Sequence, residues 1–360
     1  MPLAKRRIPV DVVHQCRFAL TPIGPMPALR DRHIHERRHF RLRSRLFVIL
    51  RVCAPVLLFA GLFWVVDLGT GFALLFGADG IPVLVALGLV QVQIVLAALR
   101  WRLTAASIGQ SIGLARAITE YYGASLLNLV LPGGVSGDVV RVARNREVGV
   151  GASAWERPAQ AVVLERASGQ IAFALVAAAG VGLWTLQPGA GVPAIASEGL
   201  RNVVLAGLLM VAVLCVLAFA ARRFAGGFVS RFAAAIRLAF LRPRDAALQL
   251  VLSLAVVAAY LAAFAAVSRA IGAPLGLTET LLLVPPVLLT MVLPVSVGGW
   301  GVREVAAAAL WPLAGFTATE GVAASALYGI VATVGALPGV FSFDFPLVRL
   351  FRKRQTSDQD

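Results

Sequence analysis

Six apolar runs, each long enough to cross a bilayer as a helix, constrain the fold of this chain most strongly. They cover about residues 46–66, 81–99, 159–186, 200–221, 246–268 and 321–343. In hydrocarbon, backbone N–H and C=O groups find partners only within helices or closed barrels. Hydrophobic residues make up 59% and charged residues 14% of the 360 residues, which excludes an ordinary soluble domain. The sequence predicts an all-α, polytopic membrane helix bundle.

Basic residues are unevenly distributed between the two ends of these runs. Lysine and arginine are absent from the connections 67–80, 187–199 and 312–320. They gather in the tail before the first run, in the other connections and after the last run, in groups that include Arg100, Arg102 and Arg116. Basic segments stay on the cytoplasmic side of a membrane. We therefore expect a multi-pass protein of the cytoplasmic (inner) membrane with both termini in the cytoplasm.

The net charge of +15 follows from the same asymmetry. Arginines next to membrane spans attract the anionic lipid headgroups of the inner leaflet. A nucleic-acid-binding protein would instead gather its basic residues into one patch or along one helix. We therefore expect membrane lipids as partners and no nucleic acid.

Three segments differ in composition. Residues 1–45 are rich in Pro, Arg and His and predict a disordered, basic cytoplasmic tail, with Met26 as an alternative to Met1 as the start. This tail lacks the unbroken apolar stretch of a signal peptide. Residues 46–348 form the predicted transmembrane domain, and 349–360 a cytoplasmic C-terminal tail.

Cysteines and histidines do not indicate a metal site or a disulfide framework. The three cysteines lie far apart in the sequence, and all four histidines fall in the N-terminal tail among arginines. Metal binding needs ligands that converge on one point. We therefore expect neither a metal nor another cofactor.

Two further apolar regions do not fit a simple span. Residues 112–140 begin on the cytoplasmic side and must return there, and residues 277–311 begin and end on the external side. Each region contains Pro and several Gly, which break a helix at membrane depth. Such breaks are tolerated only where the freed backbone groups are buried in protein or line a cavity. We predict two broken or re-entrant hairpins beside the six full spans.

The two breaks share a motif. Val130-Leu131-Pro132 precedes Arg141 in the same way that Val292-Leu293-Pro294 precedes Arg303, with glycines between Pro and Arg in both. Three predicted crossings separate the copies, so they face opposite sides of the membrane. This arrangement is typical of an inverted repeat, whose broken helices lie around a substrate site near the midplane. Agreement by chance in a chain rich in Ala, Val, Leu and Gly leaves the duplication open.

Three arginines near these breaks are candidate ligands for an anionic substrate: Arg141, Arg166 and Arg303. A guanidinium offers a bidentate fork to phosphate, and glycine-rich backbone lets N–H groups approach an anion. The other predicted substrate-binding residues are Asn128, Gly133, Gly134, Ser136, Gly137, Ser296, Gly298 and Gly299.

A carboxylate stands close to each arginine: Asp138, Glu165 and Glu304. These residues are predicted to pair with the arginines and orient them, and the same pattern also fits purely structural ion pairs. Adjacent residues do not face each other on a helix, so we expect Glu165 and Glu304 to pair with arginines of other segments. The aromatic residues Trp101, Tyr121, Tyr122, Trp300 and Trp311 are expected at the membrane interface.

Three elements resemble a known family. Asn128 to Arg141 (NLVLPGGVSGDVVR), Glu165-Arg166 and Pro294 to Glu304 (PVSVGGWGVRE) are similar to the transmembrane region of bacterial lysylphosphatidylglycerol synthases and their stand-alone, flippase-like relatives. The resemblance covers about residues 45–350 and implies a helical bundle that moves a lipid between leaflets. The chain ends at Asp360, without a soluble domain after the last span, so the resemblance does not imply aminoacyl transfer.

A lipid headgroup that crosses the bilayer carries a phosphate, whose charge is costly there unless it is paired. We therefore expect a flippase-like transporter that moves a phospholipid or isoprenoid lipid between leaflets, rather than an enzyme. Two other classes stay open: a membrane-embedded lipid-modifying transferase, and a non-transporting scaffold for lipid-biosynthesis enzymes of the cell envelope. The sequence has no P-loop for ATP, and it leaves the oligomeric state open.

Overall fold

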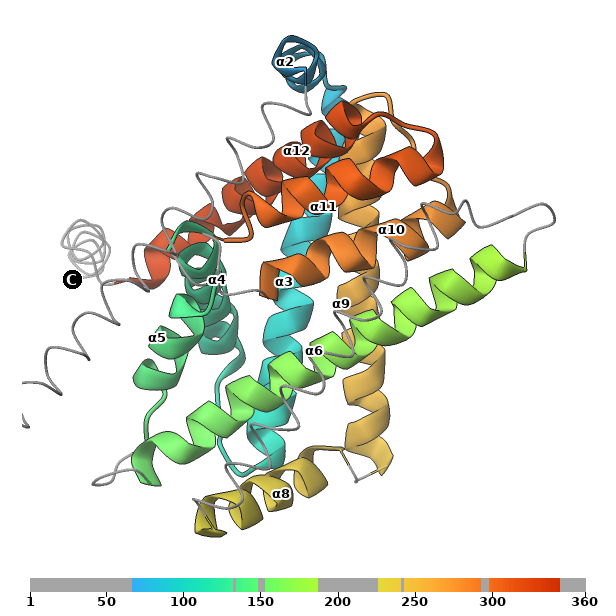
Figure 1. Ribbon diagram of the computed structural model, residues 1–360. Coiled ribbons are helices and arrows are strands. Elements are labelled where there is room, and N and C mark those ends of the chain that lie inside the picture. Colours follow the sequence, from blue (N-terminus) through green and yellow to red (C-terminus); the bar gives the residue numbers. More distant parts are fainter. Residues whose placement is uncertain are drawn as a thin grey trace, which may run out of the picture. The chain divides into compact units, whose positions relative to one another are not determined.

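The computed structural model describes residues 67–131, 134–147, 153–186, 226–240, 243–292 and 298–343, all within the unit Leu50–Asp360. The regular elements of these residues are helices (Figure 1). They are α2 (Leu68–Phe76), α3 (Gly80–Ser107), α4 (Leu114–Val130), α5 (Ser136–Arg144), α6 (Ser153–Thr185), α8 (Gly226–Phe240), α9 (Pro243–Ala270), α10 (Leu277–Leu289), α11 (Val302–Leu310) and α12 (Ala318–Ala336). Three short 3-10 helices, η2 (Thr290–Val292), η3 (Trp311–Ala314) and η4 (Leu337–Ser342), complete the described elements.

Four of these segments are long and apolar enough to cross a membrane: Gly80–Ser107, Ala154–Thr185, Arg244–Ala270 and Ala318–Ser342. They coincide with four of the six predicted runs. The other two predicted runs, at about 46–66 and 200–221, lie outside the described residues, as does the predicted N-terminal tail. A total of six spans therefore stays a prediction.

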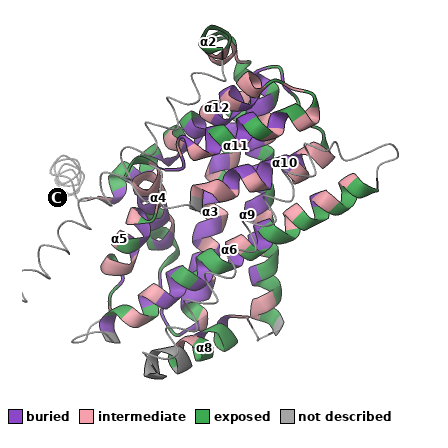
Figure 2. Ribbon diagram, in the orientation of Figure 1, coloured by how far each residue is buried: buried purple, intermediate pink, exposed green. Residues whose placement is uncertain are grey.

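The outer sides of these helices are apolar. Ile81 and Leu84 on α3, Ile171 on α6 and Val251 on α9 are all exposed. Exposed positions recur along α6 (Figure 2), whereas on α3 they gather in its first half. A water-soluble protein does not present such extended apolar surface, whereas lipid tails cover it at no cost. The described helices therefore have the surface of a membrane-embedded bundle.

The core forms where α3 and α9 pack against each other, with α6, α10 and α12 beside them. Small side chains such as Ala97 and Ala98 on α3 and Ala263 on α9 are buried along this contact. Small residues let helix backbones approach closely, and close packing holds helices together in lipid, where the hydrophobic effect contributes little. Figure 1 shows α6 running obliquely across α3 and α9, with which it is in contact.

Each predicted hairpin consists of two short helices. The first is formed by α4 and α5, and the second by α10 and η2 followed by α11. The two copies differ in where the helix resumes. α5 begins at Ser136, which places Arg141 in its second turn, whereas α11 begins at Val302, which places Arg303 in its first turn. The repeated motif therefore produces similar hairpins without identical helix boundaries.

Candidate functional site

The two broken hairpins meet at their breaks. Gly298 has a φ of +57°, and a Cβ at this position would overlap the carbonyl group of Leu129 at the end of α4. Gly134 has a φ of +63°, and its Cβ would lie 3.4 Å from the carbonyl oxygen of Met291. Only glycine combines this left-handed backbone with so close an approach. The glycines of the repeat thus bring the two breaks into direct contact.

Polar side chains satisfy the backbone groups that the first break exposes. The Asn128 side-chain oxygen accepts a hydrogen bond from the Gly137 N–H at 2.8 Å, and the Ser136 hydroxyl donates to the Leu127 carbonyl at 3.1 Å. Helix ends leave such groups without intrahelical partners. A Cβ on Gly137 would overlap the Ala124 backbone, so α5 folds back tightly onto α4. Asn128, Ser136 and Gly137 therefore shape the hairpin.

Glu165 of α6 lies at the centre of a buried ion cluster. Its carboxylate accepts hydrogen bonds from the Arg100 guanidinium, with Nε at 3.2 Å, and from Arg141 Nη2 at 3.3 Å. The Tyr121 hydroxyl donates to the same carboxylate at 3.1 Å. Glu165 is fully buried. Its pairs with Arg100 of α3 and Arg141 of α5 confirm the prediction that it pairs with arginines of other segments. One carboxylate thereby connects α3, α4 and α5 to α6.

Asp138 extends this cluster to the surface of the bundle. Its carboxylate pairs with Arg141 Nη2 at 2.9 Å and with Arg166 Nη2 at 2.8 Å. The Arg166 side chain is 44% exposed. Val139, next to Asp138 on α5, and Val163, three residues before Arg166 on α6, are also exposed. In a membrane-embedded bundle, this face presents one guanidinium among apolar side chains.

Arg141 is not fully paired. Its side chain is 1% exposed and lies over the rings of Trp101 and Tyr121, with Cζ 4.6 and 4.7 Å from the ring centroids. Among the described residues, its Nε and Nη1 groups have no hydrogen-bond partner. A buried donor without a partner costs about 1–3 kcal/mol, and more for a charged group.

Counted together, the cluster contains three guanidinium groups, of Arg100, Arg141 and Arg166, and two carboxylates, of Asp138 and Glu165. It therefore has an excess of one positive charge. Together with the two unpaired N–H groups of Arg141, this excess suits the binding of an anion.

Arg303 lies in a second cluster that is closed. The Arg303 Nε donates to Ser325 at 2.9 Å, and Nη2 pairs with Glu304 at 2.8 Å. The Ser325 hydroxyl donates to Glu304 at 2.9 Å, and the Gly301 N–H donates to the same carboxylate at 2.6 Å. Arg303 and Glu304 are both buried.

The expectation that Glu304 pairs with an arginine of another segment is wrong. Glu304 is the third residue of α11, and its side chain turns back to accept a hydrogen bond from the Gly301 N–H at the start of the helix. This turn brings the carboxylate beside the adjacent Arg303, where Ser325 of α12 bridges the two groups. The side-chain separation that holds within a regular helix does not hold at this helix end.

The two motif arginines have similar surroundings but differ in their pairing. Arg303 lies over Trp300 and Tyr328, at 5.2 and 5.5 Å, much as Arg141 lies over a Trp and a Tyr. The remaining Nη1 of Arg303 lies 4.0 Å from the sulfur of Met291. Arg141 therefore retains donor capacity that Arg303 does not. Gly299 packs beside Met291, while Gly133 and Ser296 lie outside the described residues.

For several residues, the position in the structure differs from the one expected from the sequence. Arg100 was counted with the basic residues of the cytoplasmic side, yet it is buried against Glu165. Trp101, Tyr121 and Trp311 were expected at the membrane interface, and all three are buried. An aromatic residue near the end of an apolar run can lie either at the membrane interface or in the protein core. The sequence therefore carries no signal that distinguishes the two locations. No group of three potential metal ligands occurs among the described residues.

The comparison with known families agrees with this arrangement. The family described as "Lysylphosphatidylglycerol synthase TM region" matches residues 52–339, which include both hairpins and both ion clusters. The chain belongs to this family. Its members are membrane proteins connected with lipids by that description, and the resemblance seen in the three sequence elements is confirmed. No curated protein matches the chain.

Proposed function

We propose that this multi-pass membrane protein moves a phosphate-bearing lipid, a phospholipid or an isoprenoid lipid, between the leaflets of the inner membrane. The observation that carries the proposal is the incompletely paired Arg141, in a cluster with one excess positive charge, on one of the two broken hairpins that contact each other. An anion that enters the bilayer needs such a partner, because an unpaired charge there costs several kcal/mol.

The cluster offers two successive positions for a phosphate. Arg166 reaches the lipid-facing surface, and Arg141 lies inside, with Asp138 paired to both. A guanidinium binds phosphate through two parallel N–H groups. The exposed Val139 and Val163 provide apolar contacts for the lipid tails while the headgroup is held by the arginines. The headgroup would move between Arg166 and Arg141 while the tails remain in the membrane.

Arg303 has a different part in this proposal. Its donors are directed to Ser325, Glu304 and Met291, so direct contact with a phosphate would require the pair with Glu304 to open. We propose that Arg303 holds the second hairpin in place, so that its glycines remain against the first. Direct substrate contact by Arg303 stays a prediction of the sequence that a substitution can test.

A lipid-modifying transferase is less favoured. A general base needs an accepting oxygen within hydrogen-bond reach of the proton that it abstracts. Asp138 and Glu165 are each paired with two arginines, and Glu304 is paired with Arg303 and accepts a backbone N–H. Loss of the carboxylate charge in any of these pairs would leave an arginine uncompensated in a buried site.

The proposal is tested with purified protein in liposomes that contain a headgroup-labelled fluorescent phosphatidylglycerol or a labelled polyprenyl phosphate. A membrane-impermeant reductant then reports how much labelled lipid reaches the outer leaflet. We expect faster equilibration than in protein-free liposomes, and its loss in Arg141→Ala. Arg157→Ala is the matched control, because Arg157 is 55% exposed and pairs only weakly, at 3.5 Å, with Glu147. Unchanged lipid distribution for every lipid tested, or a new lipid product in mass spectra, would contradict the proposal.

A further inference from the structure

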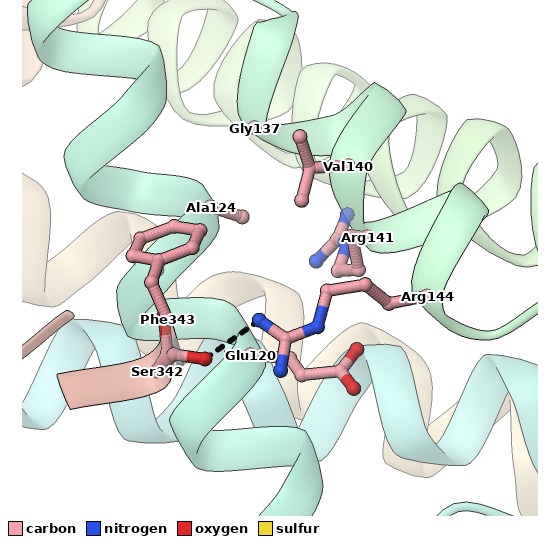
Figure 3. Close-up of a pocket in the computed structure, with 9 residues that line it drawn as sticks. Glu120, Ala124, Gly137, Val140, Arg141, Arg144, Ser342 and Phe343 are labelled. Atoms are coloured by element: carbon pink, nitrogen blue, oxygen red, sulfur yellow. Dashed lines mark hydrogen bonds between the residues drawn. The ribbon is translucent and has the colours of Figure 1, made fainter. Parts of the chain in front are cut away.

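A small pocket is lined by Arg141 and does not include Arg166 in its lining. It is lined by α4, α5 and the segment around η4, and Figure 3 shows Arg141, Arg144, Glu120, Ser342 and Phe343 around it. The Arg141 side chain is buried, and two of its N–H groups have no partner among the described residues. Arg141, which has two unpaired N–H groups, therefore lines the same pocket as Arg144.

Arg144 is held by an acceptor that can be exchanged. Its Nη1 donates to the backbone carbonyl of Ser342 at 2.7 Å, and its guanidinium lies 5.9 Å from the centroid of the Phe343 ring. A carbonyl is neutral, so this hydrogen bond leaves the charge of Arg144 uncompensated. A phosphate oxygen carries negative charge, so it adds to the hydrogen bond a charge–charge attraction that a carbonyl lacks. An anion in the pocket would therefore compete well with the Ser342 carbonyl.

The carboxylate in the pocket is already committed to other groups. Glu120 pairs with Arg116 at 2.9 Å and accepts a hydrogen bond from the Asn145 side chain. Arg116 Nη2 also donates to the carbonyl of Arg144 at 2.8 Å, which fixes the end of α5. Since Glu120 is buried and occupied, it does not neutralise Arg141 or Arg144. The pocket therefore retains positive charge.

The segment that closes the pocket is packed through glycines. A Cβ on Gly123 would overlap the Ser342 hydroxyl, and a Cβ on Gly339 would overlap the carbonyl of Tyr122. The segment around η4 thus lies so close to α4 that neither glycine position has room for a side chain. A substitution at Gly123 would displace the Ser342 end of η4 from Arg144.

We propose that this pocket is a second phosphate-binding subsite, formed by Arg141 and Arg144 when the Arg144 guanidinium leaves the Ser342 carbonyl and opens a path to the buried Arg141 N–H groups that have no partner. The inference deepens the proposed function and rests on it for the identity of the ligand as a lipid phosphate. The chemistry is that of a phosphate group, which a lipid headgroup or a free phosphate ion both carry. Arg144 would then select for the phosphate, and the segment around η4 would close over it.

Binding is measured on purified protein in a non-ionic detergent by calorimetric titration with three probes. These are dihexanoyl phosphatidylglycerol, inorganic phosphate, and dihexanoylglycerol, which lacks the phosphate. We expect the phosphate-bearing lipid to bind and dihexanoylglycerol not to bind. Arg144→Ala should weaken the binding about tenfold or more, because a charged hydrogen bond is lost, and Arg144→Lys should weaken it less. Arg144 is exposed, so its removal leaves the core intact.

Arg157→Ala is the control for the loss of one exposed positive charge and should bind as the unchanged protein does. Gly123→Ala should alter the affinity although it removes no charged group, since it displaces Ser342. Binding of inorganic phosphate alone, lost in Arg144→Ala, would support the subsite and identify a free anion as its ligand. Equal affinity of Arg144→Ala and the unchanged protein for both phosphate probes would overturn the subsite.

The translocation assay separates this inference from the proposed function. If the unchanged protein binds the phosphate-bearing lipid through Arg144 but moves no lipid between leaflets, the subsite stands and the transport proposal fails. If Arg144→Ala moves and binds lipid normally while Arg141→Ala does not, the transport proposal stands and the subsite is overturned.

Discussion

The backbone of Gly298 lies directly against the carbonyl group of Leu129, although 168 positions separate the two residues in the chain. Leu129 lies near the end of α4, just before the first break, and Gly298 lies within the second break, so this contact joins the two hairpins of the bundle. Arg141 and Arg303, the motif arginines, follow these breaks on α5 and α11. The position of both ion clusters therefore depends on a contact that has room only for glycine.

Gly298→Ala should destabilise the protein. The added methyl group would overlap the Leu129 carbonyl, and the left-handed backbone of Gly298 costs a residue with a Cβ about 1–2 kcal/mol in addition. The melting temperature in detergent should fall by several degrees, and lipid translocation should fall with it. Gly88→Ala is the control, because Gly88 lies within α3 with nothing within 4 Å of an added Cβ. It should be neutral or slightly stabilising.

Glu165→Gln should be among the most destabilising single substitutions in the bundle. Arg100 and Arg141 would both lose their shared carboxylate in a buried site, at a cost of about 3–5 kcal/mol. Adding Arg100→Gln in the same protein should recover part of this loss, because one uncompensated charge is removed. Glu147→Gln tests a surface pair for comparison, and it should change the melting temperature little. An equal change of melting temperature in Glu165→Gln and Glu147→Gln would contradict a buried ion cluster around Glu165.

Arg141 and Arg303 should respond differently to neutralisation. Arg303→Ala leaves Glu304 buried without its guanidinium, so the melting temperature should fall, and Arg303→Ala with Glu304→Gln should restore much of it together with translocation. Arg141→Ala should abolish translocation, with or without Asp138→Asn. Arg141→Lys should retain part of the activity, because it keeps the charge and loses the bidentate fork. Failure of the Arg303 and Glu304 double variant to translocate, at a normal melting temperature, would assign Arg303 to the substrate instead.

The orientation in the membrane is tested by thiol labelling of intact cells. The background has Cys16, Cys53 and Cys215 replaced by Ser. In it, Ser197→Cys should react with an impermeant reagent and Ser153→Cys should not, because basic residues surround only the second position. Permeabilised cells serve as the control that both thiols can react. The reverse pattern would place both termini on the external side.

The sequence by itself determined the class of this protein and the location of its helices. Runs such as 81–99 and 246–268 contain no charged residue and are mostly apolar, and a helix is the only way for one segment to pair its own backbone groups in lipid. Pro and Gly in the repeated motif have local effects on the backbone, so the two breaks were also predictable. The family was recognisable for the same reason, since its motifs are local strings such as PVSVGGWGVRE.

Only the tertiary structure decided which charges meet. Arg100 ends an apolar run and carries the same local signal as any cytoplasmic arginine, yet packing of α3 against α6 buries it on Glu165. Glu304 turns back onto the Gly301 N–H at the start of α11 and so lies beside its own neighbour Arg303, and Ser325 of α12 bridges the two groups. Ion pairs and aromatic stacking depend on which helix faces which. That choice is made by packing between segments far apart in the chain, about which no local pattern carries information.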